Sequence, residues 1–170
     1  FAETVYGIRI RPGIRYQPHP AFALDAAGAP LYADLDEASL GERSQIGDFE
    51  HTGTRELDAA DFAYQIKRLV RPRIESPGLA IFNQIIGLED LAARLQAEVD
   101  AGRLDPEGWI DMRQFPLEGV ETPDPHTLRI RIRGKYPQFL NWLATTFVVP
   151  VPSQAERLYG QPGRANRALT

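Results

Sequence analysis

The chain has 170 residues, which is long enough for one domain to bury a hydrophobic core. Its residues are 43% hydrophobic and 25% charged, an ordinary composition for a globular protein. The net charge of −4 argues against a dedicated polyanion-binding domain, because such domains carry an excess of Lys and Arg. The chain has no cysteine for a disulfide or thiolate metal site, and no apolar run reaches the roughly 18 residues of a transmembrane helix.

Residues 5–16, VYGIRIRPGIRY, have the pattern of a strand, a turn and a second strand. Pro12-Gly13 is the predicted turn of this hairpin. The pattern directs Arg9 and Arg11 outward. The apolar residues expected on the inner side are Val5, Ile8 and Ile10.

Residues 17–53 carry a weaker signal and are rich in Pro, Gly, Asp and Ala. We expect a loop here, with at most a short helix near residues 35–40. A loop of this length inside a compact domain is often functional or an insertion, so an insertion is predicted at about 17–53.

The next helix is marked by Asp58, a predicted N-cap, and by Asp61, which completes a capping box. Pro72 ends it, because the residue before a proline disfavours helical backbone angles. Its predicted apolar stripe is Phe62, Ile66 and Leu69.

Ser76-Pro77 is predicted to begin another helix, with Ser as the cap and Pro at the first helical position, and Gly87 to end it. Its expected buried face is Leu79, Phe82 and Ile86. A further helix is expected to run to Gly102, and its apolar stripe is Leu88, Leu91, Leu95 and Val99.

Residues 117–133 read as a hairpin in which Pro123 and Pro125 stiffen the turn. Its second strand alternates two sets of side chains, namely Arg129, Arg131 and Arg133 on one face and Leu128, Ile130 and Ile132 on the other. This is the pattern of a strand with one face in water, and we favour that interpretation over a basic recognition patch.

Pro137 is predicted to open a short helix with three apolar residues on one side, Phe139, Leu140 and Leu143. Ser153 and Glu156 form a predicted capping box for a last helix that ends near Gly160. Hairpins occur here without β-α-β repeats. The predicted fold class is therefore α+β, with an antiparallel sheet packed against several short helices.

Catalytic and metal-binding motifs are not apparent. His19, His51 and His126 each stand alone, without the spacing of a metal site. The chain has no glycine-rich phosphate loop and no nucleophile elbow. We therefore expect neither an enzyme nor a cofactor or metal.

Five stretches, taken in order, resemble the family 5 extracytoplasmic solute-binding proteins, the oligopeptide- and dipeptide-binding components of ABC importers. They are the strand pair at 5–16, the capped helix at 53–72, Ser76-Pro77, the block at 120–144 and the segment at 150–160. In that family a short turn replaces the segment at 17–53. The ends of the chain read as cuts through a longer protein.

The resemblance implies one piece, residues 1–170, of the N-terminal lobe of a two-lobed, type II periplasmic binding protein. Such a protein captures a peptide or other small solute and presents it to the permease subunits of the importer. It implies a periplasmic or extracytoplasmic location, no nucleic-acid partner, and membrane contact only through the permease or a lipid anchor outside this segment.

Some peptide binders of this family place an aromatic side chain just after the Ser-Pro, facing the ligand. By that resemblance the ligand-cleft candidates are Pro77, Gly78, Leu79 and Phe82. Two alternatives stay open. One is a protein-interaction module, without solute binding, that uses the 17–53 loop or the arginine-bearing sheet face. The other is nucleic-acid binding through the arginine strands.

Overall fold

The computed structural model describes residues 2–41, 43, 45–74 and 76–160. The chain divides into two compact units. The first, called the sheet unit, comprises Phe1–Pro12, Asp58–Pro106 and Ile110–Val151. The second, called the loop unit, comprises Gly13–Leu57, Glu107–Trp109 and Pro152–Thr170.

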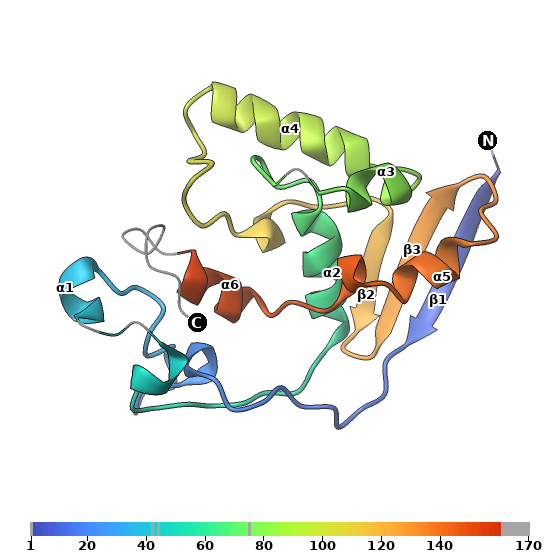
Figure 1. Cartoon of the computed structure of the whole chain (residues 1–170). Helices are drawn as coiled ribbons and strands as arrows, with labels where there is room; N and C mark the ends of the chain where they lie inside the picture. The colour runs from blue at the N-terminus through green and yellow to red at the C-terminus, as the bar shows by residue number, and fades with distance from the viewer. Residues whose placement is uncertain (1, 42, 44, 75, 161–170) are drawn as a thin grey trace. The chain divides into compact units, whose positions relative to one another are not determined.

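The sheet unit contains a three-stranded antiparallel sheet with the order β1-β3-β2 (Figure 1). The strands are β1 (Glu3–Arg9), β2 (Val120–Asp124) and β3 (Thr127–Arg133). The helices are α2 (Ala59–Arg68), α3 (Gly78–Phe82), α4 (Leu88–Asp100), α5 (Phe139–Leu143) and the 3-10 helices η3 (Met112–Gln114) and η4 (Thr146–Val148). The predicted α+β class is thus confirmed.

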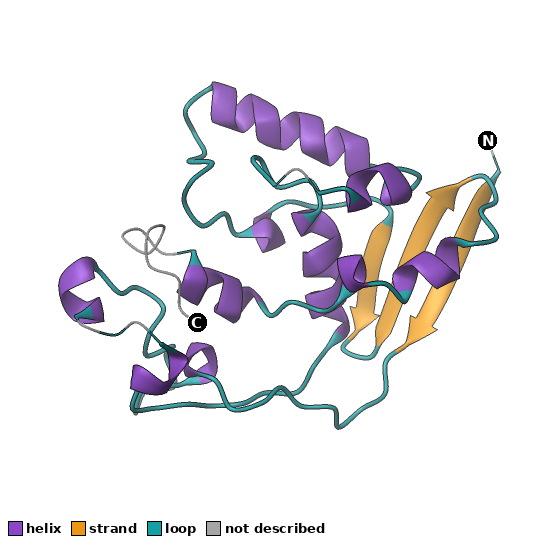
Figure 2. Cartoon of the chain, viewed as in Figure 1, coloured by secondary structure: helices purple, strands orange, loops and turns teal. Residues whose placement is uncertain are grey.

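The loop unit is built from short elements (Figure 2). They are η1 (Pro20–Phe22), α1 (Glu37–Leu40), η2 (Ile46–Asp48) and α6 (Ser153–Tyr159). The whole of the predicted insertion, 17–53, lies in this unit, and α1 falls where a short helix is expected. Its core cluster consists of Ala21, Ala23, Tyr32, Leu40, Phe49 and Leu158.

Strand β3 confirms the predicted alternation. Leu128, Ile130 and Ile132 are buried, whereas Arg129 and Arg133 are exposed. The predicted β2–β3 hairpin is also present, and α2 packs on the sheet, where its Ile66 is fully buried. Period-two alternation indicates the buried face correctly because β3 is the central strand and buries only one face.

The predicted hairpin at residues 5–16 is wrong, because β1 pairs with β3 along its whole length. Residues 14–19 run antiparallel to residues 53–57 instead, where the Tyr16 N–H donates to the Arg55 carbonyl over 3.0 Å. Two-residue hairpin turns require a positive φ at their first central position. Pro12 cannot adopt one, so only Gly13, at φ 82°, is left-handed.

The inward assignment of Val5 is wrong as well. Val5 lies on the same face as Glu3, Gly7 and Arg9, and its side chain is 58% exposed. Ile8 and Ile10 lie on the opposite face, because successive side chains of a strand alternate.

Helix α2 begins as predicted. The Asp61 N–H donates to Asp58 Oδ1 and the Asp58 N–H donates to Asp61 Oδ2, both over 3.2 Å, which completes the capping box. The helix ends at Arg68, four residues before Pro72. The residues that accept hydrogen bonds from the first N–H groups of this helix can therefore be predicted from sequence alone.

Helix α3 differs from its prediction in three details. It ends at Phe82, well before the predicted end at Gly87, and Ile85 rather than Ile86 is buried. Pro77 is its N-cap, although the Ser76 hydroxyl does accept from the Gly78 N–H over 3.2 Å. Gly87, the predicted C-cap, has a φ of 79° and immediately precedes α4. Helix α4 buries Leu88, Leu91 and Leu95, as predicted.

Two expectations near the C-terminus need correction. In α5, Phe139 is buried but Leu140 is 53% exposed, because adjacent helical positions lie about 100° apart. Ser153 is not an N-cap, since the Pro152 carbonyl already accepts from the Ala155 N–H and α6 starts at Ser153. Ser153 therefore lies inside the first turn, where it does not form the predicted box with Glu156.

Candidate functional site

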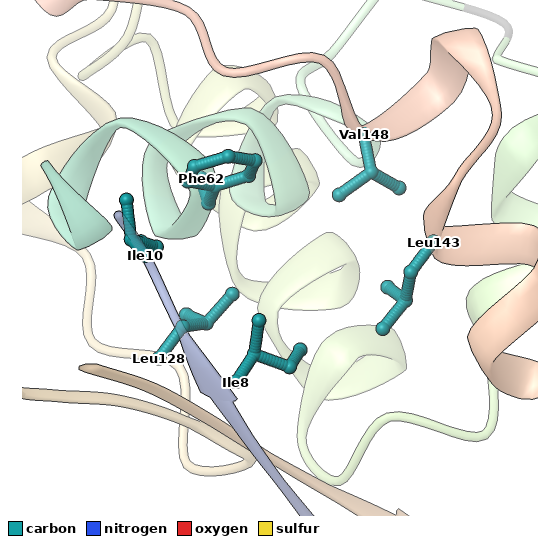
Figure 3. Close-up of a pocket in the computed structure, with 6 residues that line it drawn as sticks. All are labelled: Ile8, Ile10, Phe62, Leu128, Leu143 and Val148. Carbon is teal, nitrogen blue, oxygen red and sulfur yellow. The ribbon is translucent and has the colours of Figure 1, made fainter. Parts of the chain in front are cut away.

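An apolar pocket opens in the sheet unit between the sheet and three helical segments (Figure 3). Its volume is about 80 Å³. The side chains that line it point toward one shared space and come from β1 and its end, α2, β3, α5 and η4. They are Ile8, Ile10, Phe62, Leu128, Leu143 and Val148.

The sheet supplies the floor of this pocket. Ile8 is directly opposite Leu128 in the β1–β3 register, so both side chains point to the same face. The position of η4 is fixed on α2, because the Gln65 side-chain amide donates to the Phe147 carbonyl over 2.8 Å. Val148 follows Phe147 in the chain, and its side chain points into the same space as that of Phe62.

The pocket offers a bound group only apolar contacts. All six lining side chains are hydrocarbon, so no group there transfers a proton or attacks a substrate. Burying an apolar group contributes roughly 25 cal/mol per Å² of surface removed from water. The pocket therefore suits a small apolar group, such as one aliphatic side chain of a ligand.

The sequence-derived cleft candidates lie elsewhere, around α3. Phe82 has no exposed surface and meets the Phe139 ring edge-on at 6.0 Å. Gly78 is buried, and a Cβ there would lie 3.2 Å from Phe147 and from Leu69. The Pro77 side chain is exposed and Leu79 is half-buried. None of the four lines the apolar pocket, and their contact with a ligand stays a prediction.

Sequence reasoning missed the pocket because its lining carries an ordinary core signal. Ile8, Phe62 and Leu143 are apolar residues at strand or helix spacing, and each alone predicts burial. What creates the space is the junction of five segments that are far apart in sequence.

The arginines of β3 are each paired with a carboxylate. Arg129 lies 3.9 Å from Glu121, and Arg133 lies 3.5 Å from Glu89. Arg131 meets two carboxylates, those of Glu3 at 3.7 Å and Glu118 at 3.5 Å. Pairs of this exposure are each worth roughly 0–1 kcal/mol. The face therefore carries carboxylates beside its arginines rather than positive charge alone.

A second recess, of about 570 Å³, lies at the turn between β2 and β3. Its polar lining is Arg9, Arg11, Asp124 and His126. Hydrogen bonds from the Thr127 side chain and the His126 N–H, together with the nearby Arg9 charge, lower the pKa of the Asp124 carboxyl. Asp124 is therefore ionised and held in place.

Lys67, in the last turn of α2, has an unusual environment. Partial burial lowers the pKa of its ammonium group, and the Asp111 carboxylate opposes that shift. Asp111 is held by Arg113, which donates from Nε over 2.8 Å and from Nη2 over 2.7 Å. This pairing raises the pKa of Arg113.

His19, in the loop unit, has both ring nitrogens engaged. Nδ1 accepts from the Ala21 N–H over 3.1 Å, and Nε2 lies 2.8 Å from the Tyr159 hydroxyl. Burial lowers the pKa of this imidazole. Within the described residues, no three His, Asp, Glu or Cys side chains gather as a metal site.

Comparison with models of known protein families gives no match to the chain, and comparison with curated proteins gives no significant match. In the described part of the chain, none of the helices has the length and apolar character required to cross a bilayer.

Proposed function

We propose that the chain is part of a solute-binding protein that captures peptides or similar small solutes and delivers them to an ABC importer. It acts by reversible binding, without chemistry and without a cofactor, on the extracytoplasmic side of the membrane. The observation that carries this proposal is the ordered set of five sequence motifs that resembles the peptide-binding family. Of these, the capped helix within 53–72 and the hairpin within 120–144 form as expected, whereas the strand pair at 5–16 does not.

The apolar pocket supports a role in binding. Its lining contacts a ligand only through hydrocarbon, which favours recognition of one apolar side chain with little dependence on orientation. A peptide binder that accepts many sequences needs pockets that make apolar contacts without directional hydrogen bonds. We propose that the pocket takes up one apolar residue of the solute.

The experiment is calorimetry of the full-length protein against a library of short peptides. Binding of apolar-rich peptides in the micromolar range is expected. Absence of binding to every peptide contradicts the proposed substrate class.

The pocket is tested separately with Leu143→Trp, which fills it, and with Leu140→Trp as the matched control on the same helix. Leu143 lines the pocket, whereas Leu140 is 53% exposed. We expect about a tenfold loss of peptide affinity for Leu143→Trp alone, the scale of losing one buried side chain of the ligand. Equal affinities in the two variants would place the ligand elsewhere while leaving the substrate class intact.

A second candidate function is a protein-interaction module that uses the 17–53 loop. The observation that favours it is Leu24, an apolar side chain of this loop that is 60% exposed although the loop has its own core. Leu24→Arg is expected to abolish importer-dependent uptake without changing calorimetric solute binding. Unchanged uptake would contradict this function.

A further inference from the structure

Strand β1 is an edge of the sheet, because β3 lies between it and β2 (Figure 2). Among the described residues, β1 is paired on one side only, with β3. An exposed edge strand presents unpaired N–H and C=O groups, and proteins usually protect it with proline, lysine or a bulge. The seven residues of β1, ETVYGIR, contain no proline and no lysine, and their pairing with β3 has no bulge. The two charged residues of β1, Glu3 and Arg9, lie at its two ends.

The hydrogen-bond pattern of β3 shows which β1 groups face outward. The Arg131 N–H donates to Gly119 over 2.8 Å, so the backbone of Arg131 points toward β2. Ile130 therefore points toward β1 and bonds its partner Tyr6, because the direction alternates along an antiparallel strand. It follows that Val5 and Gly7 direct their backbone groups to the open edge.

The same argument applies to Glu3 and Arg9, which have the same parity. The outward-facing set is Glu3, Val5, Gly7 and Arg9. Their side chains also share the outer, exposed face of the sheet. These four positions decide what another strand would meet at this edge.

We propose that β1 is a self-complementary docking edge that pairs antiparallel with β1 of a second copy of the chain. In the register that overlaps all seven residues, Glu3 lies opposite Arg9 of the second copy and Arg9 lies opposite its Glu3. Opposite charges facing each other across strands are stabilising. The two-fold axis passes at Tyr6, and the sheets join into one.

The steric fit of this register is also favourable. Val5 lies opposite Gly7 of the second copy, and an added Cβ at Gly7 would meet no atom within 4 Å. The exposed Val5 side chain of each copy therefore covers the open backbone at Gly7 of the other copy, so the two-fold symmetry forms this contact twice. Shifting the strands by two residues loses both charge pairs and shortens the overlap.

Glu3 remains available for this contact. Its carboxylate lies 3.7 Å from Arg131 on the same sheet face, but the Glu3 side chain is 49% exposed. Among the described residues, Arg9 donates a long bond, 3.4 Å, to the Thr127 hydroxyl, and its charge lies near the exposed Asp124 carboxylate. Neither side chain must leave a buried partner when the edges meet.

The experiment is sedimentation equilibrium of the full chain from micromolar to submillimolar concentration. A monomer–dimer equilibrium is expected, with protection of the Val5 and Gly7 amides from hydrogen exchange that rises with concentration. A monomer at every concentration overturns the proposal. Dimers without protection of these two amides overturn it as well.

Charge reversal tests the register. Glu3→Arg and Arg9→Glu each place like charges across the edge, and each is expected to weaken the dimer about tenfold. The double variant restores both opposite-charge pairs and is expected to recover the dimer. Failure of the double variant to recover it, with circular dichroism unchanged, contradicts the proposed register.

Val5→Pro removes the outward N–H without touching the bonds to β3, and it is expected to abolish the dimer. The matched control is Val5→Thr, which keeps the N–H and the branched side chain. A dimer that survives Val5→Pro would be held by another surface.

Discussion

The sheet unit and the loop unit differ in how they satisfy the hydrogen bonds of their backbone groups. In the sheet unit, ladders and helices bond the backbone to itself, as in the β1–β3 register. In the loop unit, side chains supplement backbone bonds such as the one from the Tyr16 N–H to the Arg55 carbonyl. His19 accepts from the Ala21 N–H, the Tyr32 hydroxyl accepts from the His51 N–H, and Asp25 accepts from the Ala27 N–H.

The difference teaches how each unit depends on its residues. A ladder tolerates exchange of exposed side chains, because the main chain carries the bonds. A turn that is closed by a particular side chain fails when that side chain is replaced. The sheet unit should therefore be sensitive to core volume, and the loop unit to the identity of its polar and turn residues.

The largest effect is expected for Phe82→Ala in the core of the sheet unit. Phe82 is fully buried against Phe139, so its truncation should lower the free energy of unfolding by about 3–5 kcal/mol. Urea unfolding measures this. Leu140→Ala, at an exposed position, is the control and should change stability by less than about 0.5 kcal/mol. A small effect of Phe82→Ala would mean that the surrounding core readily collapses into the cavity left by the missing ring.

Next in size are two glycine substitutions, one in each unit. A Cβ at Gly119 would lie 2.5 Å from the Ile86 carbonyl oxygen, and one at Gly53 would lie 2.1 Å from that of Phe22. Gly119→Ala and Gly53→Ala should each cost about 1–3 kcal/mol of unfolding free energy, because both contacts are with backbone. Gly47→Ala meets no atom within 4 Å and is the control. If all three variants had the same stability in thermal melts, close contact with a neighbouring backbone would not be what requires glycine at positions 53 and 119.

A smaller loss is expected at the start of α2. Asp58→Ala removes one half of the capping box and should destabilise the chain by about 1 kcal/mol. Asp58→Asn keeps an oxygen acceptor and should recover most of this. If Asn and Ala behave alike in chemical denaturation, the charge of Asp58 rather than its hydrogen bond is what matters.

The smallest effect concerns pH and the loop unit. Burial lowers the pKa of His19 in the folded chain below the ordinary 6.5, so the unfolded chain binds the proton more tightly. The stability from neutral His19 is complete above pH 6.5, is lost as the pH falls toward the folded pKa, and is constant below it. Denaturant midpoints measured across pH should show this step. His19→Asn keeps a capping acceptor and should remove the step; its persistence would assign it to another group.

Much of the sheet unit was predictable from sequence, for reasons that individual residues show. Leu128, Ile130 and Ile132 alternate with arginines, and Asp58 with Asp61 marks a helix start; both are local signals. The apolar pocket was not predictable, since Phe62 and Leu143 carry the same signal as any core residue. Phe62 and Leu143 line the same space only because segments that are distant in sequence pack together.

By itself, the sequence determined the α+β class, the β2–β3 hairpin, the capped helix α2 and the stripe of α4. These follow from side-chain periodicity and capping within a few residues. Only the tertiary structure decided that β1 pairs with β3 and not with residues 14–16, and that no other described strand pairs with its outer edge. Strand pairing between distant segments depends on burying a common face, and that information lies in the assembled core rather than in any one stretch of sequence.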